Sequence, residues 1–282
     1  MKKLKIHFIN HDWNSNAGFF AWILSHYCKI EITPNDPDVV IVIDQIVPRY
    51  QNAKMILYTG EPHIETGQDF DCYLNCFKID QPNFFRIPLY TFYAYYLWRQ
   101  GLIKSFNSTC VMENLKESIG QKTEFCSYLA RWGGRDMPRE KIVNLVSRYK
   151  NVHCAGDHLN NYPKVPDGSI NKINFLKKYK FNIAVESCEN FNGYNGYISE
   201  KIYEPMAVNC IPIYYGCVDV KKEFNNLSFL HARDYDDEQL LTKIIEIDKN
   251  EDLYYEYLIE PFTIANNFFD KDYIIDLFKK FI

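Results

Sequence analysis

The segment GYISEKIYEPMAVNCIPIYYG begins with polar and charged side chains that could bind a phosphorylated ligand. Ser199 is a good N-cap for a helix, and Tyr197, Glu200 and Lys201 crowd around that helix start. The free N–H groups of a helix N-terminus favour an acidic residue nearby and disfavour a lysine. A bound anion such as a diphosphate would explain Lys201, and solvated surface positions for Glu200 and Lys201 are an equal alternative.

Other candidate residues follow predicted strands. Glu61 comes directly after KMILY in the sequence TGEP, and Glu186 ends the run FNIAVE. Ligands of open parallel sheets lie beyond the carboxyl ends of the strands, so both carboxylates are placed for chemistry. An Asn- and Gly-rich loop joins Glu186 to the helix start, where Gly193 and Gly196 allow close backbone approach to a ligand. Positive charge could come from three arginines after another strand, some of them better explained as surface residues: Arg131, Arg135 and Arg139.

Alternating strands and helices must position these side chains. The runs DVVIVID and KMILY are typical of parallel strands buried on both faces, and segments with helical spacing separate such runs. The pattern restarts with EFCSYLA, which indicates a second α/β domain. The last segment predicts a helix that packs on the protein, with a weak membrane-surface helix as the alternative. The sequence thus predicts two Rossmann-like domains and a closing helix: 1–119, 120–265 and 266–282.

The composition is that of a water-soluble globular protein, with 47% hydrophobic and 24% charged residues. A formal net charge of −4 argues against a general nucleic-acid binder. Nine cysteines without a CxxC pair indicate neither a disulfide framework nor a zinc site. Cys72 and Cys76 with His63 are conceivable metal ligands, but reduced thiols in a cytosolic core are favoured. The N-terminus is interpreted as a first strand and not a signal peptide, and no apolar run predicts a membrane span.

Several segments together resemble glycosyltransferase family 10, the α-1,3-fucosyltransferase family. YKFNIAVES followed by NGYISEKIYEPMAVNCIPIYYG is similar to the family's donor-site pattern YKFNIAFENS, GYVTEKI and IPIYWG. YTGEP, FFRIPLY, GDHLNNYPKV and EFNNLSFL match in order and approximate spacing. The resemblance implies a GT-B fold, two Rossmann-like domains facing across a cleft, with the acceptor mainly on the first domain and GDP-fucose on the second. It also implies an inverting transfer, in which an acceptor hydroxyl attacks the anomeric carbon of fucose and GDP leaves.

The resemblance implies roles for the candidate residues. Glu61 matches the acidic residue of the family's TGE segment, the expected general base. Lys201 matches a diphosphate contact, Glu200 the residue that holds fucose or ribose hydroxyls, and Tyr197 a residue that stacks on or hydrogen-bonds the nucleotide. Arg139 is the best match for a phosphate-binding arginine. Arg135 is the alternative match for the phosphate-binding arginine. Arg86, Asn160 and Asn161 also fit family positions, and a buried supporting role is an equal alternative for them.

Two departures touch the implied donor site. Where the family has Phe-Glu-Asn, this chain has Val185, Glu186 and Ser187, so the donor contact of that Asn passes to Ser187 or to an Asn downstream, Asn190 or Asn195. Tyr215 stands where the family has Trp. A related GT-B transferase for another nucleotide sugar is therefore an alternative. A glycan- or nucleotide-binding module without catalysis is a second alternative.

The resemblance also implies the partners. We expect GDP-fucose and an oligosaccharide acceptor that reacts at O3 of N-acetylglucosamine, such as a bacterial surface glycan of lipopolysaccharide, and no nucleic acid. No cofactor or metal is required, because Arg and Lys side chains can neutralise the diphosphate. The expected location is the cytoplasm, with peripheral contact at the inner membrane surface as a further option.

Overall fold

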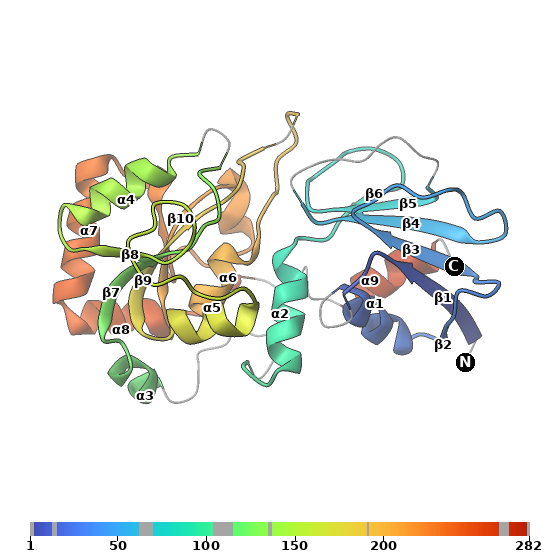
Figure 1. The fold of residues 1–282 in the computed structure, drawn as a ribbon, viewed down its shortest axis with the longest axis horizontal. Coiled ribbons are helices and arrows are strands. Elements are labelled where there is room, and N and C mark those ends of the chain that lie inside the picture. The colour runs from blue at the N-terminus through green and yellow to red at the C-terminus, as the bar shows by residue number, and fades with distance from the viewer. Residues whose placement is uncertain are drawn as a thin grey trace. The chain divides into compact units, whose positions relative to one another are not determined.

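The computed structural model describes residues 3–12, 16–61, 70–103, 115–134, 137–190, 192–264 and 271–280. The chain forms two compact α/β units, each built on its own sheet (Figure 1). Unit 1 comprises Met1–Gly101, Asn190–Tyr197 and Asn266–Ile282. Unit 2 comprises Leu102–Glu189 and Ile198–Ala265.

The sheet of unit 1 has six strands in the order β2-β1-β3-β4-β5-β6, and all neighbouring pairs are parallel. The strands are β1 (Lys3–Ile9), β2 (Lys29–Ile32), β3 (Val39–Ile43), β4 (Lys54–Thr59), β5 (Cys72–Asn75) and β6 (Phe84–Arg86). All five side chains of β3 are buried, which explains its unbroken Val/Ile sequence. The helices are α1 (Asn16–Ser25), α2 (Tyr90–Arg99) and α9 (Lys271–Lys279).

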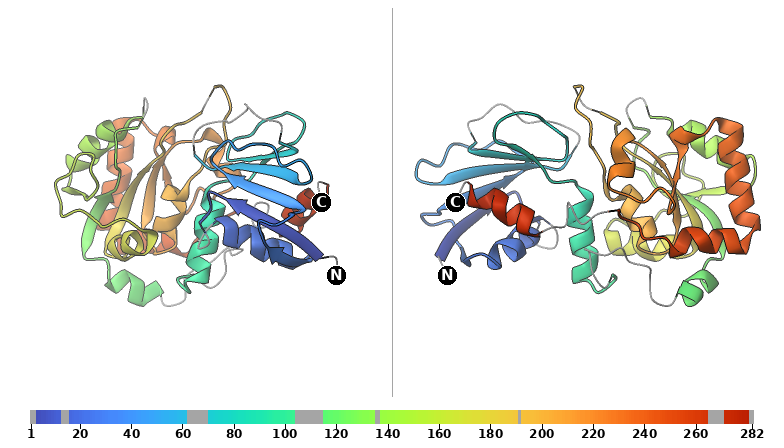
Figure 2. Two further views of the ribbon diagram at one scale, coloured as in Figure 1. Left: turned by 45° about the vertical axis from the view of Figure 1, so that its right-hand side comes forward. Right: turned by 180° about the vertical axis from the view of Figure 1, so that it is seen from behind.

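The C-terminal helix α9 packs on unit 1. Both views of Figure 2 show it beside α1, and the rings of Phe20 and Phe278 are 5.8 Å apart at a steep angle. Ile274, Leu277 and Phe278 are buried, whereas Tyr273 on the other face is 44% exposed. The helix therefore turns its apolar stripe to the protein.

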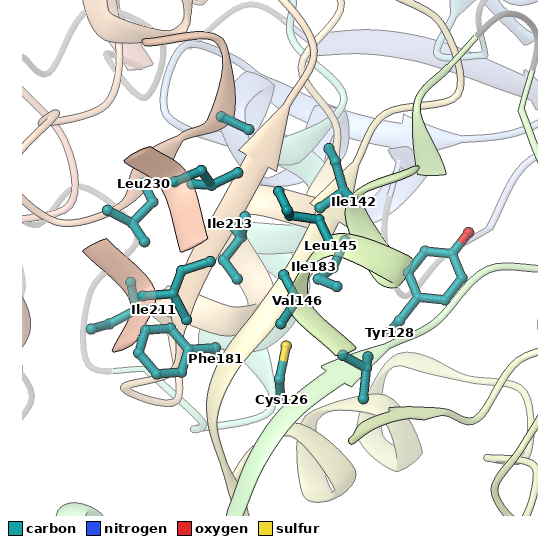
Figure 3. Close-up of a cluster of buried hydrophobic side chains, with 14 of the residues drawn as sticks. Cys126, Tyr128, Ile142, Leu145, Val146, Phe181, Ile183, Ile211, Ile213 and Leu230 are labelled. Carbon is teal, nitrogen blue, oxygen red and sulfur yellow. The ribbon is translucent and has the colours of Figure 1, made fainter. Parts of the chain in front are cut away.

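The sheet of unit 2 has five parallel strands in the order β11-β10-β9-β7-β8. The strands are β7 (Glu124–Tyr128), β8 (Val152–Cys154), β9 (Tyr179–Val185), β10 (Ile211–Tyr215) and β11 (Leu230–His231). The helices are α3 (Leu115–Gly120), α4 (Arg139–Ser147), α5 (Ser169–Leu176), α6 (Glu200–Met206), α7 (Asp237–Lys249) and α8 (Glu251–Ile259), with short 3₁₀ turns at Val218–Lys222 and Ala232–Asp234. Figure 3 shows side chains of β9, β10 and α4 converging in one buried apolar cluster.

The units divide at a different place from the boundary at 119 that the sequence favours. Unit 1 ends its first segment at Gly101, just after α2. Leu115 of α3 is 7% exposed and belongs to the apolar cluster of unit 2, so α3 lies with the second sheet. The sequence of a helix that lies, along the chain, between the strands of two sheets does not indicate on which sheet the helix packs.

One segment of the second half of the chain belongs to unit 1. In Asn190–Tyr197 the carbonyl of Asn195 accepts a hydrogen bond from Lys78 N at 2.7 Å. Arg86 donates to the carbonyl of Gly196 from Nη2 at 2.5 Å and from Nε at 3.1 Å. Arg86 is 9% exposed, which agrees with the supporting role weighed for it above. We call residues 190–197 the arm.

The part of the chain that the structure describes holds buried thiols and offers neither a metal site nor a membrane-spanning helix. Eight cysteines in this part of the chain, Cys72 and Cys76 among them, are buried. No group of three or more His, Cys, Asp or Glu side chains there is arranged to hold a metal ion. Within the same residues, no helix has the length and apolar character needed to cross a bilayer.

Asp248 ties α7 to its neighbours in unit 2. Its carboxylate accepts hydrogen bonds from Lys150 Nζ at 2.5 Å, Tyr149 Oη at 3.0 Å and Lys180 Nζ at 3.1 Å. Burial alone would raise the pKa of Asp248, but the hydrogen bonds from these side chains outweigh it and lower the pKa below the ordinary value.

Replacing Asp248 by Asn is expected to lower the free energy of unfolding by about 1–3 kcal/mol at neutral pH, because two lysines lose charge-assisted hydrogen bonds. Because the pKa is depressed in the folded state, this contribution is present above the unfolded pKa, near pH 4, and is lost as the pH falls further. Urea unfolding at pH 7 and about pH 3 should show a deficit that shrinks in acid.

Glu246→Gln on the same helix is the matched control. Glu246 is 56% exposed and pairs with Lys243 at 2.9 Å, so its loss should cost about 0.5 kcal/mol or less. A deficit for Asp248→Asn that is equal at both pH values would contradict the prediction.

Candidate functional site

The predicted helix cap at Ser199 is confirmed. Ser199 has an extended backbone (φ −103°, ψ −172°), and its side chain accepts a hydrogen bond from Lys201 N at 3.4 Å. The helix α6 buries one apolar face in the core, which includes Ile202, Tyr203 and Met206. The cap and this apolar face fix where α6 begins, at the carboxyl edge of the unit 2 sheet.

The carboxylate of Glu186, at the end of β9, is fully buried beside this helix start. Its Oε1 accepts hydrogen bonds from Ser199 N at 2.8 Å and Tyr214 Oη at 3.3 Å, and its Oε2 accepts one from Ser199 Oγ at 2.6 Å. Burial raises the pKa of Glu186, although Lys201 and the Ser199 hydrogen bonds oppose this. Gly216 must lack a side chain, because a Cβ there would lie 2.5 Å from both Glu186 Cγ and Tyr214 Oη.

Lys201 lies among acceptors of the protein itself. Its Nζ is 3.2 Å from Ser199 Oγ, 3.6 Å from Glu186 Oε2 and 3.8 Å from Glu200 Oε1. The side chains of Lys201 and Glu200 are only 18% and 15% exposed, so the alternative of solvated surface groups is wrong. Because carboxylates already accompany Lys201, a bound anion is not needed to explain a lysine at this helix start.

Glu200 is shared by two lysines. Besides Lys201, Lys172 of α5 lies with its Nζ 3.5 Å from Glu200 Oε1. Burial favours the protonated form of Glu200, but Lys201 and Lys172 outweigh it and lower its pKa to about 2. Glu200 is therefore ionised at neutral pH and can accept hydrogen bonds from hydroxyl groups.

Arg139 is the first residue of α4, and its side chain is buried. Its Nη2 donates to the carbonyls of Glu186 at 2.9 Å and Val185 at 3.2 Å, and its Nη1 donates to the carbonyl of Trp132. Its guanidinium carbon also lies 5.6 Å from the Trp132 ring centroid. These contacts hold the ends of two loops, and the phosphate contact remains a prediction. Arg135, the reserve, lies outside the described residues.

The structure divides the other predicted residues between the units. Ser187 is half-buried directly after Glu186, in unit 2. Asn195 and Tyr197 lie in the arm, in unit 1. Tyr197 is 1% exposed, and its ring stacks on Phe77 with centroids 5.7 Å apart. Contact of this ring with a nucleotide therefore stays a prediction.

Glu61 follows β4 in unit 1, where it is exposed. Its carbonyl accepts a weak hydrogen bond from Cys76 Sγ at 3.6 Å. The turn before it is held by Asp44 at the end of β3, whose Oδ1 accepts a hydrogen bond from Gly60 N at 2.9 Å. The predicted place of Glu61, at the carboxyl edge of the sheet, is confirmed by this geometry.

The sequence does not single out three charged residues of unit 2 that lie at the site: Lys172, Glu204 and Arg233. Lys172 Nζ lies 2.6 Å from Glu204 Oε2, and Glu204 is fully buried. Arg233 lies over Tyr215, 4.1 Å from the ring centroid, pairs with Glu189 and donates to the carbonyl of Gly216. The spacing of Glu200 and Glu204, four residues apart on one helix face, is the signal that could have indicated a shared cation.

Comparisons with known proteins agree on one family. The model of glycosyltransferase family 10 (fucosyltransferase), C-terminal part, matches residues 119–259. A fucosyltransferase homologue of Acanthamoeba polyphaga mimivirus is 28% identical over 95% of this chain and 44% of its own length. The α-1,3-fucosyltransferase FucT of Helicobacter pylori is 30% identical over 66% of this chain and 42% of its own length. The chain thus spans less than half the length of these curated relatives.

Solved structures give the fold. A crystal structure of an α1,3-fucosyltransferase aligns with 99% of this chain and 90% of that chain, with a TM-score of 0.77 and 21% identity. A second structure of an α1,3-fucosyltransferase, with GDP-fucose, has the same coverage, a TM-score of 0.73 and 23% identity. The predicted GT-B class, with two parallel α/β units, is confirmed.

Proposed function

Because the chain belongs to glycosyltransferase family 10, the fucosyltransferase family, we propose that it transfers L-fucose from GDP-fucose to a hydroxyl of a glycan. The observation that carries the proposal is the polar cluster of Glu186, Ser199, Glu200 and Lys201 at the carboxyl edge of β9. It lies within the residues that the family model matches. It also holds a lysine and an ionised carboxylate in fixed positions, which suits the recognition of a sugar diphosphate.

In the proposed reaction, an acceptor hydroxyl oxygen attacks the anomeric carbon of fucose from the face opposite the diphosphate. The bond from that carbon to the diphosphate oxygen breaks, and GDP leaves with the electron pair. Glu61 accepts the hydroxyl proton as general base. Lys201 stabilises the negative charge that develops on the departing diphosphate, and Glu200 accepts hydrogen bonds from sugar or ribose hydroxyls.

The acceptor that we propose is a glycan with N-acetylglucosamine, which reacts at O3. The support is the resemblance in sequence and the α-1,3-fucosyltransferase name of the Helicobacter pylori relative. We propose that Lys201 and Arg139 supply the positive charge for the diphosphate and that transfer does not require a divalent cation.

A transferase for another nucleotide sugar is a second candidate. The observation that favours it is the surroundings of Tyr215, the residue that departs from the family pattern. Arg233 covers the ring of Tyr215, and its Nε donates to the carbonyl of the next residue, Gly216, at 3.2 Å. A charged group therefore stands next to the cluster, where it can change which sugar is accepted.

Two measurements test the proposal and separate the candidates. Calorimetry should detect binding of GDP and GDP-fucose to the whole chain. A glycan array incubated with GDP-fucose, GDP-mannose and UDP-N-acetylglucosamine should gain mass in the GDP-fucose arm alone. Turnover of a UDP sugar in place of GDP-fucose would favour the second candidate, and absence of GDP binding would refute the first.

A further inference from the structure

The five charged side chains around α6 form one chain of alternating sign. Glu204 meets Lys172 at 2.6 Å, Lys172 meets Glu200 at 3.5 Å, Glu200 meets Lys201 at 3.8 Å, and Lys201 meets Glu186 at 3.6 Å. Three carboxylates thus share two ammonium groups. All five side chains are at most 22% exposed, so water screens their interactions poorly.

This arrangement creates competition for Lys201. Glu186 and Glu200 both attract its ammonium, and a diphosphate would have to draw on the same charge. Lys172 lessens the competition, because it neutralises Glu200 from the other side while pairing with Glu204. Burial opposes the charge on Lys172, but Glu204 and Glu200 outweigh it and raise its pKa above the ordinary value, so Lys172 stays a cation.

We propose that Lys172 is a positioning residue for the diphosphate: by pairing with Glu200, it leaves the ammonium of Lys201 available to the ligand. The inference rests on the proposed function, because it supposes that a nucleoside diphosphate binds at Lys201. Lys172 acts through Glu200 and is not assigned a contact with the substrate.

A purely structural role of Lys172 and the positioning role predict different effects on ligand binding when either partner of the Lys172–Glu204 pair is replaced. If the pair only holds α5 against α6, breaking it from either side should weaken ligand binding alike. If Lys172 acts by occupying Glu200, removal of Glu204 frees Lys172 to pair more fully with Glu200. Lys201 is then released further, and the affinity for a diphosphate is kept or improved.

The experiment is calorimetric titration of the whole chain with GDP at pH 8. Burial raises the pKa of Glu204 to about 7, against the opposing effect of Lys172, so Glu204 is mostly ionised at that pH. Lys172→Met should raise the dissociation constant about tenfold, and Lys172→Arg should restore it to within about threefold of wild type. Glu204→Gln should bind GDP at least as tightly as wild type. Lys243→Met, which removes a surface pair with Glu246, is the matched control and should change nothing.

The outcomes separate cleanly. Equal weakening by Lys172→Met and Glu204→Gln, or wild-type affinity in Lys172→Met, overturns the inference alone. A wild-type protein that binds no GDP overturns the proposed function and the inference with it. If Lys172→Met does not fold, the double variant Lys172→Met/Glu204→Gln is used in its place, because it removes both charges of the pair. The double variant should then bind GDP about tenfold more weakly than Glu204→Gln, and equal affinity refutes the inference.

Discussion

Replacing Glu61 by Gln is expected to lower the rate of fucosyl transfer by about 10²–10⁴-fold, the contribution that a general base makes to such a step. Gln keeps the shape of the side chain but cannot accept the proton of the acceptor hydroxyl. Glu61 is exposed, so the change should leave the fold intact. Glu61 is assigned no contact with the diphosphate, so the dissociation constant for GDP should stay within about twofold of wild type.

Single-turnover transfer with saturating GDP-fucose measures the rate directly, and calorimetry measures GDP binding on the same sample. Glu31→Gln is the matched control, because Glu31 is also a partly exposed carboxylate of unit 1, paired with Lys3. Transfer by Glu61→Gln at more than half the wild-type rate would remove Glu61 from the reaction and reopen the identity of the base.

Replacing Lys201 by Ala is expected to weaken GDP binding by about 10²-fold or more, since removing one partner of a buried charge pair costs about 2–5 kcal/mol. Two effects act in the same direction. The diphosphate loses an ammonium group, and Glu186 and Glu200, which that ammonium partly neutralises at 3.6 and 3.8 Å, then repel the ligand. The transfer rate should fall with the affinity, because the same charge stabilises the departing diphosphate.

The same substitution also unbalances buried carboxylates, so its effect on folding must be measured separately. Far-ultraviolet circular dichroism and thermal unfolding identify the folded fraction before each titration. Lys201→Arg keeps a cation and should retain more of the affinity than Ala does. A folded Lys201→Ala protein that binds GDP within threefold of wild type would show that the diphosphate binds elsewhere.

The elements that carry the site follow from local sequence. Buried strands such as β3 can be predicted from their Val/Ile runs, and the places of Glu61 and Glu186 follow because each comes at the end of such a run. The cap at Ser199 is also local, because it needs only a side chain near the N–H groups of its own helix.

What the sequence does not show are contacts between elements far apart in the chain. Lys172 reaches Glu204 only because α5 packs beside α6, and nothing in the spacing of α5 indicates that neighbour. The sequence predicts a phosphate contact for Arg139 but does not indicate its buried hydrogen bonds to three main-chain carbonyls, because these depend on the path of the loops around it. The arm could not be assigned to unit 1, because its Asn and Gly residues carry no periodicity.

The arm has a consequence for protein engineering. A chimera in which residues 1–101 are exchanged for those of a relative would leave the original arm packed against a different protein surface. Arg86 donates hydrogen bonds to a main-chain carbonyl of the arm. If the relative that supplies residues 1–101 has no arginine at that position, the chimera would lose these hydrogen bonds. Recombination should therefore exchange three segments together, Met1–Gly101, Asn190–Tyr197 and Asn266–Ile282, and the two junctions of the arm then fall within a few residues of Glu186 and Lys201.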